Sequence, residues 1–384
     1  MAAGGIDEAL VAKVPSPGYV VDERLLEANL KCLEKVQKRT GVKILLALKA
    51  FAMYSTFPLI QKYLDGTCAS GLHEARLGRE TFGKEVHVYA PAYQERNFRE
   101  IVNHADHVVF NSVHQWERLK HVVEAAPRPV SCGLRVNPEY SEIKTPLYDP
   151  CAPASRFGIR ATQIETLPAG IEGIHFHCLC EQDAGVLERV FSSFEAKFGH
   201  LLSSVKWLNL GGGHLITKPG YDVDALCNLL LRIRKRYGVQ IYLEPGEAIA
   251  LNAGFLVSTV VDIIENGSIT IAILDTSATA HMPDVLEMPY RPAIVGAGHI
   301  GDFPNGYKLG GISCLAGDVI GDYSFSRKLQ IGDRLVFTDM AHYTMVKNNT
   351  FNGIPLPAIS CIKRDGSITI VKEFGYDDYK RRLS

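Results

Sequence analysis

One apolar run decides the fold, Lys43-Ile44-Leu45-Leu46-Ala47-Leu48-Lys49-Ala50. Six of its eight residues are apolar, and those from Ile44 to Leu48 follow one another without a polar break. Such a run is typical of a strand that is buried on both faces of a parallel sheet. Lys49 closes the run, where an unpaired buried ammonium costs several kcal/mol or gives up its proton. Because a neutral amine attacks carbonyl carbon, Lys49 is a candidate catalytic residue, and a lysine that merely reaches water at the strand end is the alternative.

Seven more short runs of apolar or β-branched residues follow along the chain. They are Thr67–Ser70, Val86–Ala90, His107–Asn111, Gly133–Asn137, Ile171–Cys178, Val205–Leu210 and Ile241–Glu244. Amphipathic segments of helical length separate most of them, namely His73–Thr81, Gln94–His104, Val113–Glu124, Gly185–Leu202 and Val223–Tyr237. Eight alternating strand and helix units predict an α/β fold of the (β/α)8 TIM-like barrel type.

Both flanks of this barrel carry further predicted structure. Pro17–Val21 predicts a short strand, and Asp22 is a good N-cap for a helix with apolar positions from Leu25 to Val36. The connection from Pro138 to Pro168 contains five prolines and predicts a long functional loop.

Beyond Gly254 the long helical patterns stop, and β-type runs separated by Gly, Pro and Asn clusters predict a C-terminal all-β domain. These runs are Phe255–Asp262, Ser268–Leu274, Ala293–Val295, Arg334–Thr338 and Ser367–Val371. We therefore expect a barrel over residues 22–252 and a β-sandwich or barrel domain over 253–384, which the N-terminal strand within 1–21 joins.

Composition narrows the class of partner. The chain has 384 residues, is 46% apolar and carries a formal net charge of −1, without long blocks of like charge. This balance argues against nucleic acid or an anionic membrane as the main partner and favours a small molecule. Without a run of roughly 18 apolar residues or a secretory pattern in Met1–Gly5, we expect a cytoplasmic protein. Nine cysteines then predict reduced thiols, and since Cys178 and Cys180 lack a second pair at zinc-ribbon spacing, no metal site is expected.

Polar residues and glycines gather where the predicted barrel strands end. Lys49 ends the first strand, His177 the sixth and Glu244 the eighth, while Gly211-Gly212-Gly213 follows the seventh. Loops after barrel strands share one face, and barrels often bind phosphate after the seventh and eighth strands. A flexible turn, a core histidine and a capping carboxylate are the alternatives for the glycines, His177 and Glu244. Together the four features predict a site where an imidazole stacks on a flat ring and a carboxylate keeps a ring nitrogen protonated.

These residues carry a family resemblance. The lysine, Ile174-His-Phe-His177-Cys-Leu-Cys-Glu181, the three glycines and Glu244-Pro245-Gly246 together resemble the fold-type III pyridoxal-phosphate enzymes. That family includes the ornithine, arginine and diaminopimelate decarboxylases and, further off, alanine racemase. Ser313–Asp318 and Ala341–Thr344 resemble its Cys-x-x-x-Asp and Ala-Tyr segments, so the match covers essentially the whole chain. Leu274–Asp284 and His177–Glu181 most resemble the carboxynorspermidine (carboxyspermidine) decarboxylases within the family.

The resemblance implies an alanine racemase-like barrel, the cofactor pyridoxal 5'-phosphate and a role for each matching residue. Lys49 would bond covalently to the cofactor, His177 would stack on its ring, and Glu244, followed by Gly246, would pair with the ring nitrogen. The three glycines and Tyr343 would hold the phosphate. Cys314 would return a proton after CO₂ is lost, in the active site of a partner subunit, so the family also implies a homodimer with shared active sites.

One departure from the family pattern bears on the substrate. Related decarboxylases usually carry arginine after Glu-Pro-Gly, where this chain has Glu247. The inverted charge favours a cation at the far end of the substrate. Asp284, Glu287 and Asp318 add acidic candidates for binding substrate amines, and each of the four acids has solvation as its alternative. Which group replaces the arginine at the phosphate is open.

The sequence therefore predicts a decarboxylase of carboxynorspermidine or carboxyspermidine in polyamine synthesis. Arg156, in Ser155–Gly158, and Arg135 are weaker candidates near the cofactor, with structural ion pairs as the alternative. Other readings are a decarboxylase of diaminopimelate, ornithine or arginine, a non-catalytic pyridoxal-phosphate protein, and a cofactor-free sugar-phosphate barrel enzyme.

Overall fold

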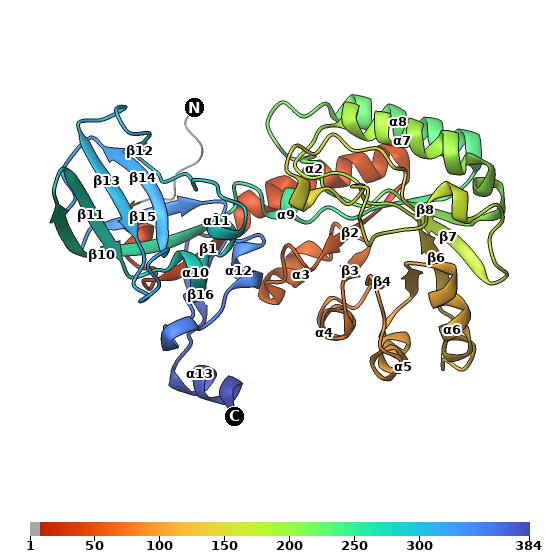
Figure 1. The fold of residues 1–384 in the computed structure, drawn as a ribbon, viewed down its shortest axis with the longest axis horizontal. Coiled ribbons are helices and arrows are strands. Elements are labelled where there is room, and N and C mark those ends of the chain that lie inside the picture. The colour runs from red at the N-terminus through yellow and green to blue at the C-terminus, as the bar shows by residue number, and fades with distance from the viewer. Residues whose placement is uncertain (1–7) are drawn as a thin grey trace. The chain divides into compact units, whose positions relative to one another are not determined.

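The computed structural model describes residues 8–384, which form two compact units (Figure 1). One unit comprises residues 28–249, and the other combines residues up to 27 with residues 250–384. Met1–Gly5 lie outside the described residues. The domain limits 22–252 and 253–384 stay a prediction.

The first unit is a closed barrel of eight parallel strands, as predicted. The strands are β2 (Lys43–Ala47), β3 (Gly66–Ala69), β4 (Glu85–Tyr89), β5 (His107–Phe110), β6 (Ser131–Arg135), β7 (Ile171–His175), β8 (Trp207–Asn209) and β9 (Gln240–Leu243), and β9 pairs with β2 to close the barrel. The helices and turns around it are α2 (Glu23–Thr40), η1 (Tyr54–Thr56), α3 (Phe57–Ile60), α4 (Leu72–Leu77), η2 (Gly78–Phe82), α5 (Glu95–His104), α6 (Val113–Glu124), η3 (Pro146–Tyr148), η4 (Ala161–Gln163), α7 (Ala184–Phe198), η5 (Gly199–Ser204), α8 (Val223–Tyr237) and α9 (Glu247–Ala250). Figure 1 shows α7 and α8 side by side on the outside of the barrel.

Strand β2 is buried as its sequence predicts, and residues 44–48 are inaccessible or nearly so. The strand ends at Ala47, however, and Lys49 lies in the turn that follows with its side chain exposed. The buried ammonium expected at Lys49 is therefore wrong, because the barrel wall stops before this residue. Leu48 and Ala47 are fixed by backbone hydrogen bonds to Cys68 O (3.0 Å) and Pro245 O (3.1 Å), so the turn has a fixed base.

A large aromatic side chain fills the middle of the barrel. Trp207 is 3% exposed and packs with Leu45, Val109 and Tyr242. Two glycines make room for its indole, since a Cβ at Gly173 would lie 2.0 Å from the ring and one at Gly133 would lie 2.3 Å from it. The indole N–H donates to the Ser131 hydroxyl at 2.9 Å. These glycines are therefore required by close packing and not by backbone flexibility.

The second unit contains a nine-stranded sheet within residues 8–384. Along the chain its strands are β1 (Gly18–Asp22), β10 (Gly254–Asn266), β11 (Ile269–Leu274), β12 (Ala297–Gly298), β13 (Asn305–Gly310), β14 (Val319–Phe325), β15 (Arg334–Thr338), β16 (Ala358–Ile362) and β17 (Ile368–Lys372). β1 pairs with β10 antiparallel and with β16 in parallel, which places the N-terminal strand inside this sheet. Short helices accompany the sheet: α1 (Glu8–Val11), α10 (Ala278–His281), α11 (Asp284–Glu287), α12 (Thr344–Lys347), η6 (Phe351–Gly353) and α13 (Tyr376–Leu383).

The predicted strand at Ala293–Val295 is wrong, because only a single bridge from Ile294 to Phe337 forms there. Four strands escaped the sequence analysis, namely the two-residue β12 and the longer β13, β14 and β16. Glycines interrupt β13 and β14, so their apolar alternation is short.

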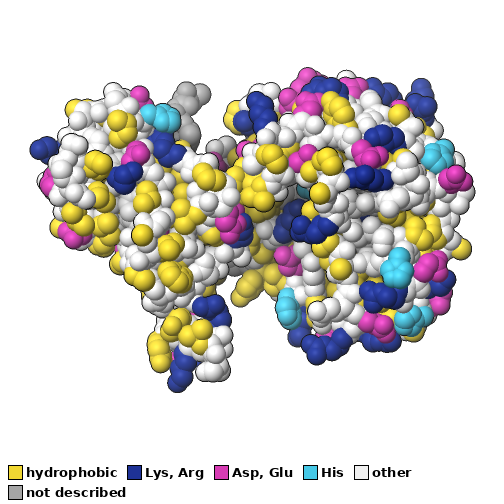
Figure 2. Space-filling view, in the orientation of Figure 1, with side chains coloured by type: hydrophobic (Ala, Val, Ile, Leu, Met, Phe, Trp, Pro, Cys, Tyr) yellow, Lys and Arg dark blue, Asp and Glu magenta, His cyan; other side chains and the backbone are white. Residues whose placement is uncertain are grey.

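The surface carries charges of both signs. Figure 2 shows Lys, Arg, Asp and Glu side chains interspersed on both units, which agrees with the net charge of −1. Within residues 8–384 no helix combines the length and the apolar character needed to cross a membrane.

Candidate active site

The carboxyl ends of β2, β7, β8 and β9 bring the predicted barrel residues to one rim. Lys49 follows β2, His177 follows β7, the three glycines follow β8 and Glu244 follows β9. Burial lowers the pKa of His177 well below its usual value, and the charges of Lys49 and Arg135 add to the effect. Lys49 and His177 thus lie on the same rim, at the carboxyl ends of β2 and β7.

His177 is held in one orientation by its neighbours. The Gly212 N–H donates to His177 Nδ1 at 3.0 Å, so the neutral ring carries its proton on Nε2. Arg135 donates to the His177 carbonyl at 3.0 Å. The Arg135 guanidinium is buried and lies 4.6 Å from the ring centres of both Tyr89 and Phe157. These contacts fix the guanidinium that holds the backbone of His177 after β7.

Arg156, the other basic candidate, is exposed. Its guanidinium lies 4.4 Å from the centre of the Phe157 ring. Its carbonyl accepts a hydrogen bond from Asn111 at 2.8 Å. Arg156 thus helps to hold the loop after β6, whose start is also fixed by the bridge between Val136 and Ile159.

The glycine run is packed tightly against both neighbouring strand ends. Gly211 and Gly213 adopt positive φ angles of 70° and 87°. A Cβ at Gly212 would lie 2.1 Å from the Glu244 carbonyl oxygen, and one at Gly213 would lie 1.9 Å from that of Leu179. The fold itself thus requires these glycines, whether or not an anion binds.

Two of the three glycine amides already have acceptors within the chain. Gly211 donates to Asn209 Oδ1 at 2.8 Å, and Gly212 donates to His177. The Gly213 N–H has no acceptor in the described part of the chain. Of the three amides, Gly213 is consequently the one that is available to a phosphate.

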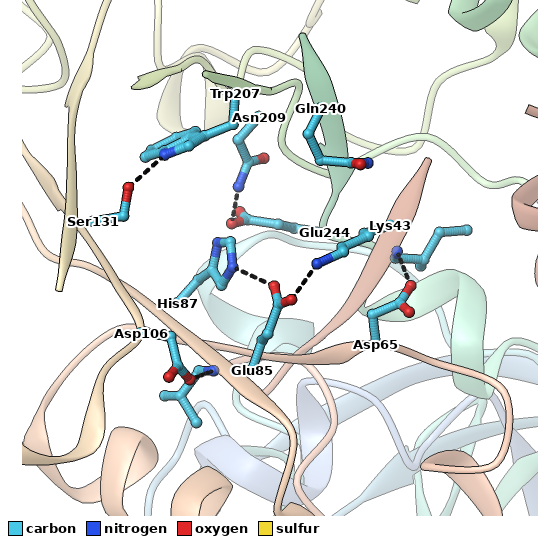
Figure 3. Close-up of polar contacts among 12 residues, drawn as sticks. Lys43, Asp65, Glu85, His87, Asp106, Ser131, Trp207, Asn209, Gln240 and Glu244 are labelled. Carbon is cyan, nitrogen blue, oxygen red and sulfur yellow. Dashed lines mark hydrogen bonds and ion pairs between the residues drawn. The ribbon is translucent and has the colours of Figure 1, made fainter. Parts of the chain in front are cut away.

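Glu244 is fixed at both carboxylate oxygens. Asn209 donates to Oε1 at 2.6 Å, and His175 Nε2 lies 3.5 Å from Oε2 (Figure 3 shows the Asn209 contact). Burial alone would raise the pKa of Glu244, but His175, His87 and the Asn209 hydrogen bond bring it well below its usual range. Glu244 is therefore a buried carboxylate that keeps its charge, as a partner for a protonated ring nitrogen must.

Gly246 and Glu247 continue this strand end. A Cβ at Gly246 would lie 2.4 Å from that of Ala50, so the segment after β9 packs directly on the turn that holds Lys49. Glu247 begins α9 and is half-buried. Burial raises the pKa of the Cys180 thiol to about 11, and the charges of Glu181 and Glu247 add to this shift. The Glu247 charge therefore acts on the segment that follows His177.

In the second unit the structure holds Cys314 on a fixed turn. Cys314 is exposed, and its N–H donates to Asn352 Oδ1 at 2.9 Å. Asp318 is 4% exposed and accepts hydrogen bonds from the backbone N–H groups of Ala278 (2.6 Å) and Ser313 (3.1 Å). The Asp318 carboxylate thus ties the turn that carries Cys314 to the start of α10.

The remaining predicted residues of this unit lie at α11 and α12. Lys347 forms ion pairs with both Asp284 and Glu287. Tyr343 precedes α12 with a φ of 52°, a left-handed conformation that costs a non-glycine residue energy. The backbone N–H groups of Val346 and Lys347 donate to its carbonyl at 3.1 and 2.9 Å. Asp284, Glu287 and Asp318 therefore all have partners within the chain.

His175, Asn209 and Cys68 were missed by the sequence analysis. Both His175 and Asn209 end barrel strands and contact Glu244. Burial and, after it, the Glu244 charge raise the pKa of the Cys68 thiol well above its usual value. His175 precedes His177 by two positions, so strand alternation places both side chains on the same face. This spacing of two residues is the signal in the sequence from which His175 could have been predicted as a site residue.

Comparison with known proteins identifies the family. Residues 19–341 match the family model described as "Pyridoxal-dependent decarboxylase, C-terminal sheet domain". The chain belongs to the pyridoxal-dependent decarboxylases. It is accordingly a decarboxylase, as its sequence predicted, and the two other classes considered, a non-catalytic cofactor-binding protein and a cofactor-free sugar-phosphate enzyme, are not its family.

Relatives within the pyridoxal-dependent decarboxylases match the chain over nearly its whole length. A carboxyaminopropylagmatine decarboxylase from Synechocystis is 47% identical over 98% of both chains. A carboxynorspermidine/carboxyspermidine decarboxylase from Campylobacter jejuni is 44% identical over 96% of this chain and 99% of its own. The crystal structure of carboxynorspermidine decarboxylase with norspermidine, also from Campylobacter jejuni, has a TM-score of 0.90 over 96% of this chain and all of the other, at 44% identity. These matches confirm the resemblance on which the sequence analysis rested.

Proposed function

We propose that this decarboxylase removes CO₂ from carboxynorspermidine or carboxyspermidine, forming norspermidine or spermidine in polyamine synthesis, with pyridoxal 5'-phosphate as its cofactor. The observation that carries the proposal is the Glu244 carboxylate, which Asn209 holds by a hydrogen bond beside His175, on the same rim of the barrel as Lys49 and His177. The names of the full-length relatives support the substrate class.

The residues of the barrel rim fit this cofactor. A buried, ionised Glu244 suits a protonated pyridine nitrogen, the oriented His177 ring suits a flat aromatic face, and the exposed Lys49 amine suits a bond to an aldehyde. The Gly213 amide, with Tyr343, is proposed for the phosphate, while Gly211 and Gly212 shape the loop. When bound, the cofactor supplies an electron-accepting ring that stabilises the charge left by the departing carboxylate.

Each side chain has a task in this proposal. Glu244 holds a proton at the ring nitrogen, since its low pKa keeps it anionic across the physiological range. His177 packs against the ring, and Arg135 keeps the His177 backbone in place. Cys314 donates a proton to the product carbon, and Asp318 holds the turn that positions Cys314.

Substrate selection is proposed to depend on acidic side chains. Glu247 replaces the usual arginine of the family and attracts the distal cation of the substrate. Asp284 and Glu287 bind substrate amines only if Lys347 gives up its ion pairs with them, so these two acids have the weaker part. Asp318 is assigned to the Cys314 turn instead of direct substrate contact.

The proposal includes a homodimer in the cytoplasm. In a homodimer the exposed Cys314 can act in the barrel of the partner subunit, as the family resemblance implies. Light scattering of the purified protein measures the mass of the assembly and so tests the dimer. All nine cysteines are free, which suits a reducing compartment.

A second candidate substrate is carboxyaminopropylagmatine. The 47% identical Synechocystis relative is named for it, and its agmatine part ends in a guanidinium. Both candidates present a distal cation, so Glu247 suits either one.

Release of CO₂ from a panel of substrates tests the assignment. The panel contains carboxynorspermidine, carboxyspermidine, carboxyaminopropylagmatine, diaminopimelate and ornithine. We expect the carboxylated polyamines to be turned over with the highest kcat/KM and Glu247→Gln to raise KM roughly tenfold for them. Preference for carboxyaminopropylagmatine would select the second candidate, and turnover of diaminopimelate alone would overturn both.

The cofactor is tested separately from the substrate. Borohydride reduction of the purified holoenzyme should fix the cofactor to the peptide that contains Lys49, which peptide mass spectrometry identifies. Attachment at a different lysine would contradict the role of Lys49.

A further inference from the structure

A second polar cluster lies at the opposite, amino-terminal end of the barrel. Glu85 is the first residue of β4, His87 lies on the same strand, and His107 is the first residue of β5. Their rings contact Trp207 and Tyr242 in the barrel interior. Lys49 follows the carboxyl end of β2, so this cluster is not part of the rim described above.

Two of these side chains are spaced like ligands of one ion. Glu85 Oε2 lies 3.3 Å from His87 Nε2, and one donor atom from each of Glu85, His87 and His107 lies within 4.8 Å of the others. Two ligand atoms on a tetrahedral ion, each bonded at roughly 2.0–2.1 Å, are about 3.3 Å apart. The Glu85 and His87 atoms thus already have the spacing of two ligands, and the His107 atom lies within 4.8 Å of both.

The carboxylate is divided between two partners. Figure 3 shows Glu85 between His87 and Lys43. Lys43 bonds to Oε1, whereas Oε2 faces His87. An ion at Oε2 leaves the lysine contact intact, in the way that groups behind a metal ligand usually orient it.

Both imidazoles have a buried nitrogen without a partner. Nδ1 of His87 and Nδ1 of His107 accept or donate no hydrogen bond within residues 8–384, although His87 is only 1% exposed. Instead the two rings stack on each other with centres 4.0 Å apart and planes inclined by 23°. Buried nitrogens of this kind are rare in folded proteins and require an explanation.

The protonation states of these groups suit a cation. Burial, together with neighbouring His87, lowers the pKa of His107 to about 3, so the ring keeps its lone pairs at neutral pH. Burial raises the pKa of Glu85, but hydrogen bonds from His87 and Lys43 outweigh it and lower the pKa to about 2. The Glu85 carboxylate and the His107 ring are therefore unprotonated at neutral pH.

We propose that Glu85, His87 and His107 bind a divalent first-row transition metal ion, with one carboxylate oxygen and two imidazole nitrogens as ligands and water completing the coordination. The ion joins β4 to β5 inside the barrel and satisfies the His107 nitrogen that has no partner. Ligands of this type suit zinc and its neighbours better than calcium or magnesium. The sequence contains no spacing motif for these three ligands, because they come from two strands and alternate with apolar residues.

Zinc binding by the purified holoenzyme tests the site. Protein that has been treated with chelator is dialysed against zinc chloride, and the bound metal is measured by mass spectrometry. We expect one zinc ion per chain at this site in the wild type, and at least tenfold weaker binding in both Glu85→Gln and His107→Gln. Both positions are only partly buried, which favours folding of the variants, and circular dichroism verifies it.

A matched control is available on the surface. His121 Nε2 lies 3.6 Å from Glu95 Oε1, a histidine and glutamate pair without a second histidine. His121→Gln should bind zinc like the wild type. Zinc should also raise the melting temperature of the wild type and of His121→Gln by several degrees, and that of Glu85→Gln not at all.

Three outcomes would overturn the proposal. They are the absence of zinc binding by the wild type, equal binding by the wild type and both ligand variants, and equal loss in His121→Gln. Because metal content and melting temperature do not depend on turnover, they judge this site separately from the proposed decarboxylation.

Discussion

The two ends of the barrel interior both hold charged side chains, but they differ in how these are paired. At the carboxyl rim both oxygens of Glu244 face a neighbouring side chain, and His177 is oriented by Gly212 and Arg135. At the amino-terminal end His87 and His107 each keep a buried nitrogen without a hydrogen-bond partner, and at the rim His175 does so at both ring nitrogens. The two ends differ in that the rim carboxylate and the His177 ring are held by neighbouring groups, whereas the rings of His87 and His107 stack on each other.

The largest expected effect comes from removing the rim amine. Lys49→Ala should lower kcat/KM by roughly 10³-fold or more, because no other group in the proposal bonds to the cofactor. Lys206→Ala, at the amino-terminal side of β8 where Lys206 pairs with Glu172, should retain wild-type activity. Decarboxylation assays of both variants with added cofactor measure the contrast, and an active Lys49→Ala enzyme would remove the functional difference between the two ends.

A carboxylate pair gives the next largest contrast. Glu244→Gln should lower kcat/KM by roughly 10²-fold, since a neutral amide does not keep a ring nitrogen protonated. Glu172→Gln, which loses contacts to Ser131 and Lys206, should leave kcat/KM unchanged. Steady-state kinetics and the absorbance of bound cofactor report both, and equal rates for the two variants would argue against the role of Glu244.

Packing in the middle of the barrel is expected to affect stability instead of chemistry. In Gly173→Ala the added methyl would lie 2.0 Å from the buried Trp207 ring, so the free energy of unfolding should fall by about 3 kcal/mol. At Gly71, which has an extended φ of −177° and no atom within 4 Å of an added Cβ, alanine should change stability by less than about 0.5 kcal/mol. Urea unfolding of both variants tests this, and equal midpoints would show that the indole can move aside.

The smallest effect concerns pH and a histidine at the rim. His214 forms a hydrogen bond with Tyr221 at 2.7 Å, and burial lowers the pKa of His214 from the usual 6.5 to about 4. Between these values the unfolded chain binds more protons, so stability is full above pH 6.5 and is lost as the pH falls toward 4. Because of His214, the free energy of unfolding should therefore be about 2 kcal/mol lower at pH 5 than at pH 7. His214→Gln should reduce this loss, whereas a variant of the exposed His200 should not, as urea unfolding at both pH values measures.

Much of the fold could be predicted because the barrel strands are continuous apolar runs with functional residues at their ends. The rim residues follow directly from this pattern, since a strand end is visible in the sequence. The amino-terminal cluster could not be found in this way. Glu85-Val-His-Val-Tyr89 alternates polar and apolar residues, which usually indicates one face in water, whereas in a closed barrel the polar face points inward.

Contacts between side chains from different strands were also beyond the sequence. The exposure of Lys49 depends on where the barrel wall stops, and the partners of Asp284 and Glu287 depend on how α12 packs near α11. Glycines in β13 and β14 hid two strands of the second unit, because their apolar positions are too few to show a period.

The layer formed by Trp207, Leu45, Val109 and Tyr242 lies in the barrel interior, and the His87 ring packs against its Tyr242. This layer does not isolate the two ends electrically, because His87 is among the groups that lower the pKa of Glu244 at the rim. A change of charge at His87 should therefore be felt by the carboxylate that faces the proposed ring nitrogen.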